Sequence, residues 1–215
     1  MSVNEHYSIE LIRDELDRYL GGGIPKNSMI LLEGQDGSGK SIICQRFTFA
    51  LLKKGQSITY ISTELNTLDF IKQMNSLNYD VRNFLLTQQL LFITMVPFMG
   101  KVDFNRDFFD HIIKQKRLFD NDIIIFDTFS FLLIKKGAEG QEYFDIVNFF
   151  KGLNNLNKTI IFTIDPEHLD EKFLTLLRSM ADMYIQANIS TFAGETVRNL
   201  DIKRFKRPKD LYMPK

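Results

Sequence analysis

Short apolar runs alternate with longer amphipathic stretches along most of the chain. The apolar runs have the length of buried strands and cover residues 29–33, 57–62, 90–96, 122–127 and 159–165. The stretches between them repeat apolar residues at helical spacing over 40–53, 68–77, 106–119, 141–154 and 169–180. This alternation is typical of βαβ units. It predicts an α/β fold with a mostly parallel central sheet flanked by helices.

The C-terminal part of the chain has a different pattern. Residues 182–190 and 196–207 both have the character of extended strands, and a turn containing Phe192, Ala193, Gly194 and Glu195 joins them. This predicts an antiparallel hairpin appended to the parallel sheet. We expect a single domain over residues 1–215, with a loosely ordered tail at 208–215.

Composition excludes several classes of protein. A chain of 215 residues with 44% hydrophobic and 25% charged residues fits one globular domain with a sizeable core. The 27 basic and 27 acidic residues balance, which argues against nucleic acid as a partner. The absence of a long apolar run and of signal-peptide features predicts a cytoplasmic protein.

Cysteine and histidine usage limits the redox and metal chemistry. Cys44 is the only cysteine, so no intrachain disulfide forms. The three histidines, His6, His111 and His168, are scattered without a second ligand at a useful spacing. We therefore expect no metal other than magnesium.

One segment matches a motif that indicates a specific class of ligand. It matches the phosphate-loop pattern G-x-x-x-x-G-K-[ST] and consists of Gly34, Gln35, Asp36, Gly37, Ser38, Gly39, Lys40 and Ser41. In this pattern backbone amides cradle phosphate oxygens, the lysine reaches the β- and γ-phosphates, and the terminal hydroxyl joins the Mg²⁺ shell. The strand before the loop and the helix after it favour a nucleoside triphosphate site over a plain glycine-rich turn.

A second carboxylate is needed to position the magnesium ion. Asp127 ends the buried strand 122–127, and ligands of open parallel sheets bind beyond that edge. We predict that Asp127 and Ser41 hold Mg²⁺ together. The alternative is an aspartate that caps a turn. Thr128 and Ser130 either lie near the phosphates or are turn residues.

Hydrolysis also requires a group that orients the attacking water. Thr128 follows Asp127 directly, so a glutamate in that position is excluded. Glu64 is the candidate, because it follows strand 57–62, which we place beside the phosphate-loop strand. The alternative is an acid favoured by the dipole of the helix that begins after Asn66.

The basic stretch at residues 203–207 is the third candidate element. On an extended strand Arg204 and Lys206 share one face, opposite Lys203, Phe205 and Arg207. Arg204 and Lys206 are therefore candidates for trans-acting cations that reach the nucleotide of a neighbouring subunit. The alternative is a solvated basic edge strand that discourages aggregation.

Several segments together resemble one family. They are LDRYLGGGIP at residues 16–25, the phosphate loop, ITYISTE at 58–64, IIIFDTFSFLL at 123–133, and the basic strand near the C-terminus. In this order, over residues 14–207, the chain resembles the KaiC-like branch of the RecA superfamily of P-loop NTPases. Within that branch it is most similar to the archaeal flagellar (archaellum) accessory ATPases.

The resemblance implies roles and partners. It implies ATP with Mg²⁺ at the phosphate loop, water activation by Glu64, and trans action of Arg204 and Lys206. It further implies a homo-oligomeric ring that works beside a secretion-type motor ATPase and a membrane platform protein, held peripherally at the membrane through these partners. The chain departs from the family pattern in two places. Thr63-Glu64 offers one acid where the family usually has two adjacent acids, and the basic pair has the order Arg-x-Lys in place of Lys-x-Arg. These departures favour a regulatory protein with slow or no hydrolysis.

Two other functions fit parts of the sequence. A RecA- or RadA-like DNA-stimulated ATPase would need basic and aromatic residues in a loop, and Phe129, Phe131, Lys135 and Lys136 follow Asp127. The zero net charge argues against this function. A small-molecule kinase would need an arginine-rich lid, and the sequence shows no such cluster.

Overall fold

The computed structural model describes residues 5–95, 114–133 and 141–212. Within these residues a seven-stranded sheet has the order β5-β4-β6-β7-β3-β8-β9, and β9 alone runs antiparallel to its neighbour. The strands are β3 (Met29–Glu33), β4 (Ile58–Ser62), β5 (Leu90–Thr94), β6 (Ile123–Asp127), β7 (Thr159–Ile164), β8 (Met183–Phe192) and β9 (Glu195–Phe205). A small antiparallel pair, β1 (His6–Tyr7) and β2 (Ile24–Pro25), lies outside this sheet.

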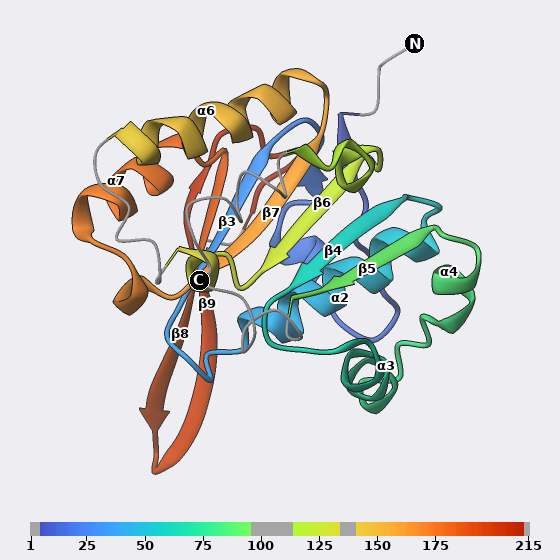
Figure 1. Ribbon diagram of the computed structural model, residues 1–215. Coiled ribbons are helices and arrows are strands. Elements are labelled where there is room, and N and C mark those ends of the chain that lie inside the picture. Colours follow the sequence, from blue (N-terminus) through green and yellow to red (C-terminus); the bar gives the residue numbers. More distant parts are fainter. Residues whose placement is uncertain (1–4, 96–113, 134–140, 213–215) are drawn as a thin grey trace.

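Helices cover both faces of the sheet (Figure 1). The α-helices are α1 (Leu16–Tyr19), α2 (Lys40–Lys53), α3 (Thr67–Ser76), α4 (Arg82–Leu86), α6 (Gln141–Asn155) and α7 (Glu171–Met180). Short 3₁₀ turns occur at η2 (Lys116–Phe119), η3 (Ser130–Leu132) and η4 (Pro166–His168). One buried cluster joins the sheet to α2 and α3, and a second joins it to α6 and α7.

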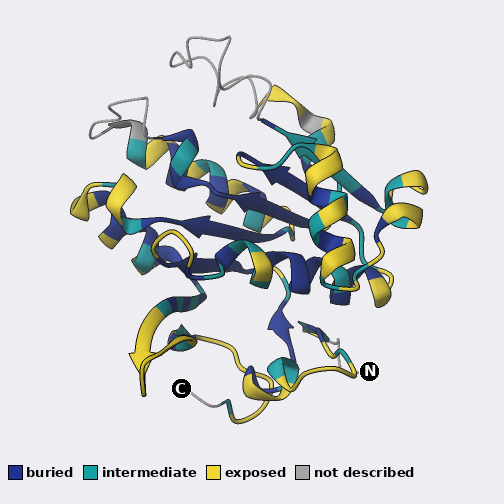
Figure 2. Cartoon of the chain, turned by 90° about the horizontal axis from the view of Figure 1, so that it is seen from below, coloured by how far each residue is buried: buried dark blue, intermediate teal, exposed yellow. Residues whose placement is uncertain are grey.

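The packing of strand β6 explains why its sequence is apolar almost throughout. All five of its residues are buried, and the middle of the sheet is largely buried (Figure 2). Ile123 and Ile125 belong to the cluster on the α2 face, whereas Ile124 and Phe126 belong to the cluster on the α6 face. A parallel strand covered on both sides has no solvent face, so it does not alternate apolar with polar residues. Only its last residue, Asp127, brings a charge to the carboxyl edge.

The structure confirms the predicted α/β fold with its mostly parallel sheet and C-terminal hairpin. Strand β3 and helix α2 have the predicted bounds, α3 begins and ends one residue earlier than predicted, and α6 ends one residue later. The predicted helix at 106–119 lies mostly outside the described residues, and its last four positions form the 3₁₀ turn η2. Val96, the predicted end of β5, also lies outside them.

The predicted placement of β4 beside the phosphate-loop strand is wrong. Strands β6 and β7 lie between β4 and β3. Helix α2 packs on these two strands as it crosses the sheet, which carries the chain past two strand positions before it returns in β4. Because all these strands are parallel, the ends of β4 and β3 still lie at the same edge.

The C-terminal hairpin is long and projects beyond the sheet (Figure 1). Its turn consists of Ala193 and Gly194, whose φ values of 52° and 84° are typical of a tight two-residue hairpin. A register shift opposite Tyr184 and Ile185 leaves Lys203 as an extra residue in β9. This bulge explains why Ile202 and Phe205, three positions apart, are both buried.

The segment after β9 has no regular secondary structure over residues 208–212, and the ring of Tyr212 packs against Phe205 at 5.4 Å. Residues 213–215 lie outside the described part of the chain.

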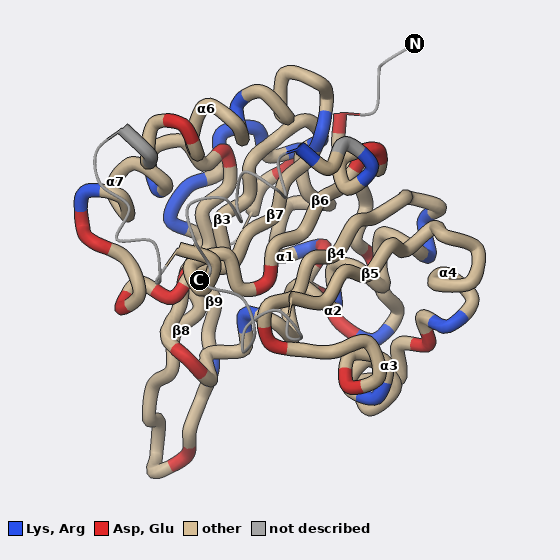
Figure 3. Tube along the Cα trace, viewed as in Figure 1, with Lys and Arg blue, Asp and Glu red and all other residues tan. Residues whose placement is uncertain are grey.

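Acidic and basic residues are interspersed over the elements (Figure 3). Of the described helices, none combines the length and the apolar character needed to cross a membrane.

Candidate functional site

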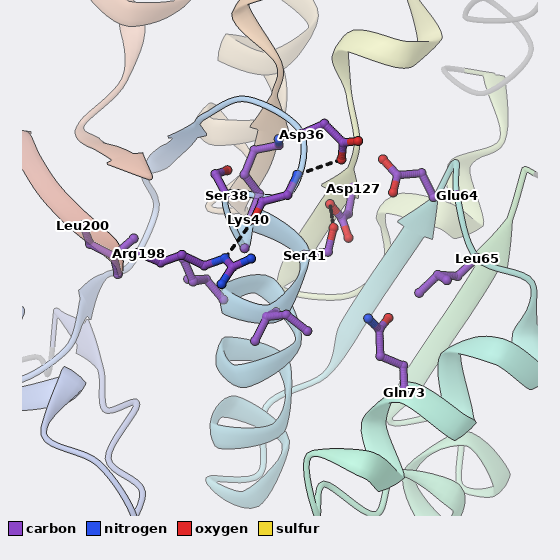
Figure 4. Close-up of a pocket in the computed structure, with 14 residues that line it drawn as sticks. Asp36, Ser38, Lys40, Ser41, Glu64, Leu65, Gln73, Asp127, Arg198 and Leu200 are labelled. Carbon is purple, nitrogen blue, oxygen red and sulfur yellow. Dashed lines mark hydrogen bonds between the residues drawn. The ribbon is translucent and has the colours of Figure 1, made fainter. Parts of the chain in front are cut away.

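A cavity of about 600 Å³ opens at the carboxyl edge of the sheet. The phosphate loop, the start of α2, the end of β4 and strand β9 surround it (Figure 4). Its lining residues are Asp36, Gly37, Ser38, Gly39, Lys40, Ser41, Ile42, Ile43, Glu64, Leu65, Gln73, Asp127, Arg198 and Leu200. Six of the eight phosphate-loop residues, together with Asp127 and Glu64, therefore share one cavity.

The glycines of the loop are required by its geometry. A Cβ on Gly34 would lie 2.5 Å from the carbonyl oxygen of Ala187, so no side chain fits there without movement of the backbone. Gly37 and Gly39 have φ values of 73° and 95°, which residues with a side chain rarely adopt. Gly39 is also the N-cap of α2, so the amides of the first helical turn face the cavity.

The polar groups of the loop fit a chain of phosphates. Lys40 is 7% exposed, and its Nζ donates to the carbonyl oxygens of Gly34 at 2.7 Å and Gln35 at 2.8 Å. The buried Ser38 hydroxyl has no hydrogen-bond partner among the described residues. A buried cation and an unsatisfied hydroxyl beside a helix N-terminus suit an anionic ligand.

The remaining side chains of the loop make contacts at its rim. The Asp36 carboxylate accepts a hydrogen bond from the Gly37 amide at 2.8 Å. The Gln35 side chain donates to Glu167 at 2.9 Å, which joins the loop to the turn after β7. Gln35 and Gly34 do not line the cavity themselves.

The two predicted magnesium ligands lie in contact. The Ser41 hydroxyl donates to Asp127 Oδ1 at 3.1 Å, which joins the start of α2 to the end of β6 (Figure 4). A hydroxyl and a carboxylate are hard oxygen donors of the kind that Mg²⁺ prefers, next to a loop that suits phosphates. The donor set therefore fits a magnesium ion, and its role at this position stays a prediction.

Asp127 is held from several sides. Its Oδ1 also accepts from the Thr163 hydroxyl at 2.9 Å, and its Oδ2 accepts from the Tyr60 hydroxyl at 2.6 Å. Burial raises the pKa of the Asp127 carboxyl, and the nearby Glu64 carboxylate adds to the rise, whereas the three hydroxyl donors oppose it. Burial and the charge of Asp127 raise the pKa of Tyr60 well above its ordinary value. Tyr60 therefore acts as a donor to this carboxylate.

Glu64 lines the cavity opposite the phosphate loop. Its Oε1 accepts a hydrogen bond from the Thr128 hydroxyl at 2.8 Å, so the residue after Asp127 orients the candidate acid. The backbone amide of Thr128 donates to the Thr63 hydroxyl at 2.9 Å, which ties the same two segments together. The N-cap of α3 is Asn66, whose side chain accepts from the Asp69 amide. Water activation by Glu64 stays a prediction.

Arg204 and Lys206 do not line the cavity of their own chain. Arg204 Nη1 donates to the carbonyl oxygens of Arg178 at 2.7 Å and Ser179 at 3.0 Å, at the C-terminal end of α7. Lys206 Nζ lies 3.2 Å from Asp182 Oδ1. Arg204, on the edge strand β9, therefore contacts the end of α7, and Lys206, just after β9, contacts the segment between α7 and β8. A trans action on a neighbouring nucleotide stays a prediction.

The loop after Asp127 is described only in part. Ser130 accepts from the Asp165 amide at 3.0 Å, as a turn residue does. Phe129 is buried in the core, so it is not available to stack on a base. Lys135 and Lys136 lie outside the described residues.

Sequence reasoning missed Tyr60, Gln73, Arg198 and Leu200. Arg198, on β9, donates from Nε to the carbonyl oxygen of Gly37 at 2.9 Å. No motif marks this arginine, because its place depends on how the hairpin folds back beside the loop. Tyr60 leaves a weak signal, since it is a polar-tipped residue in a fully buried strand.

Comparisons with known proteins find similar chains over nearly the whole sequence. The family model described as "ATPase: KaiC" matches residues 12–210. The "Archaeal flagellar ATP-binding protein FlaH" of Methanocaldococcus jannaschii is 40% identical over 200 residues, which are 93% of this chain and 85% of that protein.

Two solved structures resemble the fold closely. The crystal structure of the flagellar accessory protein FlaH from Methanocaldococcus jannaschii has a TM-score of 0.91 at 38% identity, and covers 98% of this chain and 92% of its own. The KaiC-like protein PH0186 from Pyrococcus horikoshii has a TM-score of 0.75 at 15% identity, over 96% and 91% of the two chains. These likenesses confirm the predicted KaiC-like fold.

Proposed function

Because the chain belongs to the KaiC-type ATPases and, within them, to the archaeal flagellar ATP-binding proteins called FlaH, we propose that it acts as a nucleotide-dependent regulator of the archaellum motor. Its family gives it an ATP-binding role associated with the archaeal flagellum. In our proposal ATP and Mg²⁺ bind at the cavity, and the occupied site promotes assembly of a ring and contact with partners.

The observation that carries the proposal is the contact between Ser41 and Asp127 at the mouth of the phosphate loop, with 3.1 Å between Oγ and Oδ1. The loop alone would fit many anions. A hydroxyl and a buried carboxylate held together beside it add the donors that a metal–triphosphate complex requires.

Each group of the site has a role in this proposal. The amides at the start of α2 and the Lys40 ammonium bind phosphate oxygens, and Lys40 exchanges its carbonyl partners for them. Ser41 and Asp127 would hold Mg²⁺, which would supply positive charge against the phosphates. Thr128 orients Glu64 toward the cavity, where its carboxylate positions an attacking water.

Slow hydrolysis follows from what surrounds Glu64. The Thr63-Glu64 pair offers one acid at the end of β4, and the candidate trans-acting cations, Arg204 and Lys206, contact other groups of the same chain. A subunit without a neighbour therefore lacks the two trans-acting cations that would help to stabilise the transition state. The proposed ring would supply them in trans, so assembly and turnover would be linked.

We propose that the partners are the secretion-type motor ATPase and the membrane platform protein of the archaellum, and that these contacts hold a cytoplasmic protein at the membrane. The test is a pull-down of the purified motor ATPase with the tagged chain, with a non-hydrolysable ATP analogue and Mg²⁺, with ADP, or without nucleotide. We expect retention of the motor ATPase with the ATP analogue only.

Variants make the test specific. Lys40→Ala and Asp127→Ala should lose nucleotide binding and motor binding together. Lys53→Ala removes a lysine from the other end of α2 and should change neither. Motor binding that persists in a variant shown not to bind ATP would contradict the coupling. Stimulation of hydrolysis by single-stranded DNA would instead favour the DNA-repair alternative.

A further inference from the structure

The two carboxylate oxygens of Asp127 have different partners. Oδ1 accepts from Ser41 at 3.1 Å and from Thr163 at 2.9 Å. Oδ2 accepts from the Tyr60 hydroxyl at 2.6 Å, which is the shortest of the three distances. Tyr60 therefore fixes one carboxylate oxygen, and the proposed metal ligand Ser41 contacts the other.

Tyr60 is suited to hold a group in place. It lies in the middle of β4, where it pairs with Ile125 of β6, two positions before Ser62 pairs with Asp127. The whole residue is inaccessible to solvent. Its ring packs against Phe70 at 5.1 Å and Phe92 at 5.7 Å between centroids. The hydroxyl is thus positioned by the packed core of the sheet, not by a surface loop.

A carboxylate with one oxygen fixed has little freedom to rotate, so the position of its other oxygen is also set. A short hydrogen bond from a neutral donor to an ionised oxygen is stronger than a neutral pair, and more so in a buried site. Groups that orient a metal-binding carboxylate typically change metal affinity by about 10- to 100-fold when they are removed.

We propose that Tyr60 is a positioning residue of the magnesium site, which holds Asp127 so that Oδ1 faces Ser41 and the metal. The inference rests on the proposed Mg²⁺–nucleotide function. It predicts that Tyr60 governs how strongly Mg²⁺ enhances nucleotide binding, and leaves the binding of metal-free nucleotide almost unchanged. A residue that only fills the core would not separate these two affinities.

The variant Tyr60→Phe removes the hydroxyl and keeps the ring contacts. The dissociation constant of a fluorescent, non-hydrolysable ATP analogue is measured in excess Mg²⁺ and in EDTA. We expect the enhancement by Mg²⁺ to fall by about tenfold or more, while the affinity in EDTA stays within about twofold of wild type. The EDTA measurement also reports whether the variant is folded.

Tyr184→Phe is a matched control. Tyr184 also donates its hydroxyl to a buried carboxylate, that of Glu33, at 2.9 Å, but Glu33 does not line the cavity, whereas Asp127 does. The same chemical change should therefore leave the enhancement by Mg²⁺ at its wild-type value. Electron paramagnetic resonance of bound Mn²⁺ with the same analogue gives a second readout, since the metal signal should change in Tyr60→Phe only.

The proposal can fail in distinguishable ways. A wild-type enhancement by Mg²⁺ in Tyr60→Phe would overturn the positioning role. A further loss of the enhancement by Mg²⁺ when Tyr60→Phe is added to Asp127→Asn would also overturn it. A residue that acts through Asp127 should have no additional effect in the Asp127→Asn variant. The double variant has no buried charge at this position, so it provides the test even if the single variant is unstable. A wild-type protein that binds no nucleotide would instead overturn the proposed function.

Discussion

Arg198 donates a hydrogen bond from Nε to the carbonyl oxygen of Gly37 at 2.9 Å. The contact joins the C-terminal hairpin to the phosphate loop of the same chain, across 161 positions of sequence. The side chain also packs near Gly39, since a Cβ placed there would lie 3.7 Å from Arg198 Cδ. Strand β9 thus carries one arginine at the cavity of its own chain and another, Arg204, at the end of α7.

Replacement of Arg198 by alanine should weaken nucleotide binding. The variant loses one hydrogen bond to the loop, worth about 1 kcal/mol, and a positive charge beside the cavity. We expect the affinity for the Mg²⁺–ATP analogue to fall by about fivefold or more, measured by fluorescence titration. Lys203→Ala removes a cation from the same strand, where it pairs with Asp201, and should not change the affinity. Equal effects of the two variants would mean that only the charge of the strand matters.

Glu64→Gln should separate binding from hydrolysis. The amide is close to isosteric with the carboxylate but cannot accept a proton, so single-turnover hydrolysis should fall by about 100-fold or more. Nucleotide affinity should stay within about twofold of wild type. Thr128→Val removes the donor to Glu64 and should give a smaller loss. Glu195→Gln, in the distant hairpin, is the control, and hydrolysis at the wild-type rate in Glu64→Gln would assign the water to another group.

Local sequence was sufficient to predict the half of the site that forms within one strand–loop–helix unit. The glycines, Lys40 and Ser41 lie within eight consecutive residues, and their geometry depends on their own backbone angles. Asp127 could be predicted equally well, because a strand covered on both faces can carry a charged residue only at its end. The residue types in these segments determine the local structure directly.

The rest depends on the order of strands, which a single sequence does not reveal. Two strands separate β4 from β3, so the stated reason for choosing Glu64 was wrong although Glu64 lines the cavity. Arg198 reaches the loop only because the hairpin adds to the sheet beside β3. The bulge at Lys203 likewise depends on pairing with β8, and simple alternation along β9 does not predict it.

The trans-acting role of Arg204 and Lys206 is testable through assembly. Lys206→Ala should leave nucleotide binding by the single chain unchanged and reduce ATP-dependent oligomerisation, measured by light scattering after size-exclusion chromatography. Arg204→Ala should do the same. It should also cost about 1 kcal/mol of stability, because Arg204 satisfies carbonyl oxygens at the end of α7.

Arg207→Ala is the control for this pair. Arg207 belongs to the same basic stretch but donates to the carbonyl oxygens of Lys26 at 3.0 Å and Asn27 at 2.9 Å. We expect it to assemble as wild type does. If all three variants lost assembly equally, net charge at this edge would explain the result, and the trans role of Arg204 and Lys206 would be wrong.

The buried acid before the phosphate loop provides a test of stability. Glu33 is the last residue of β3, and its carboxylate side chain is 2% exposed. Arg178 holds it with two hydrogen bonds of 2.8 Å, from Nε and Nη2. Burial and the Glu33 carboxylate raise the pKa of Tyr184 to about 12, so its hydroxyl remains a donor to Glu33 at neutral pH.

Arg178→Ala should destabilise the protein by about 3 kcal/mol, because it leaves the Glu33 charge buried without its cation. Arg178→Lys should give an intermediate loss, since lysine keeps the charge but not the paired geometry. Arg82→Ala breaks an ion pair with Asp80 whose side chains are 65% and 56% exposed, and should leave the urea midpoint almost unchanged. Urea unfolding followed by circular dichroism measures all three. Equal urea midpoints for Arg178→Ala and Arg82→Ala would show that Glu33 does not depend on Arg178.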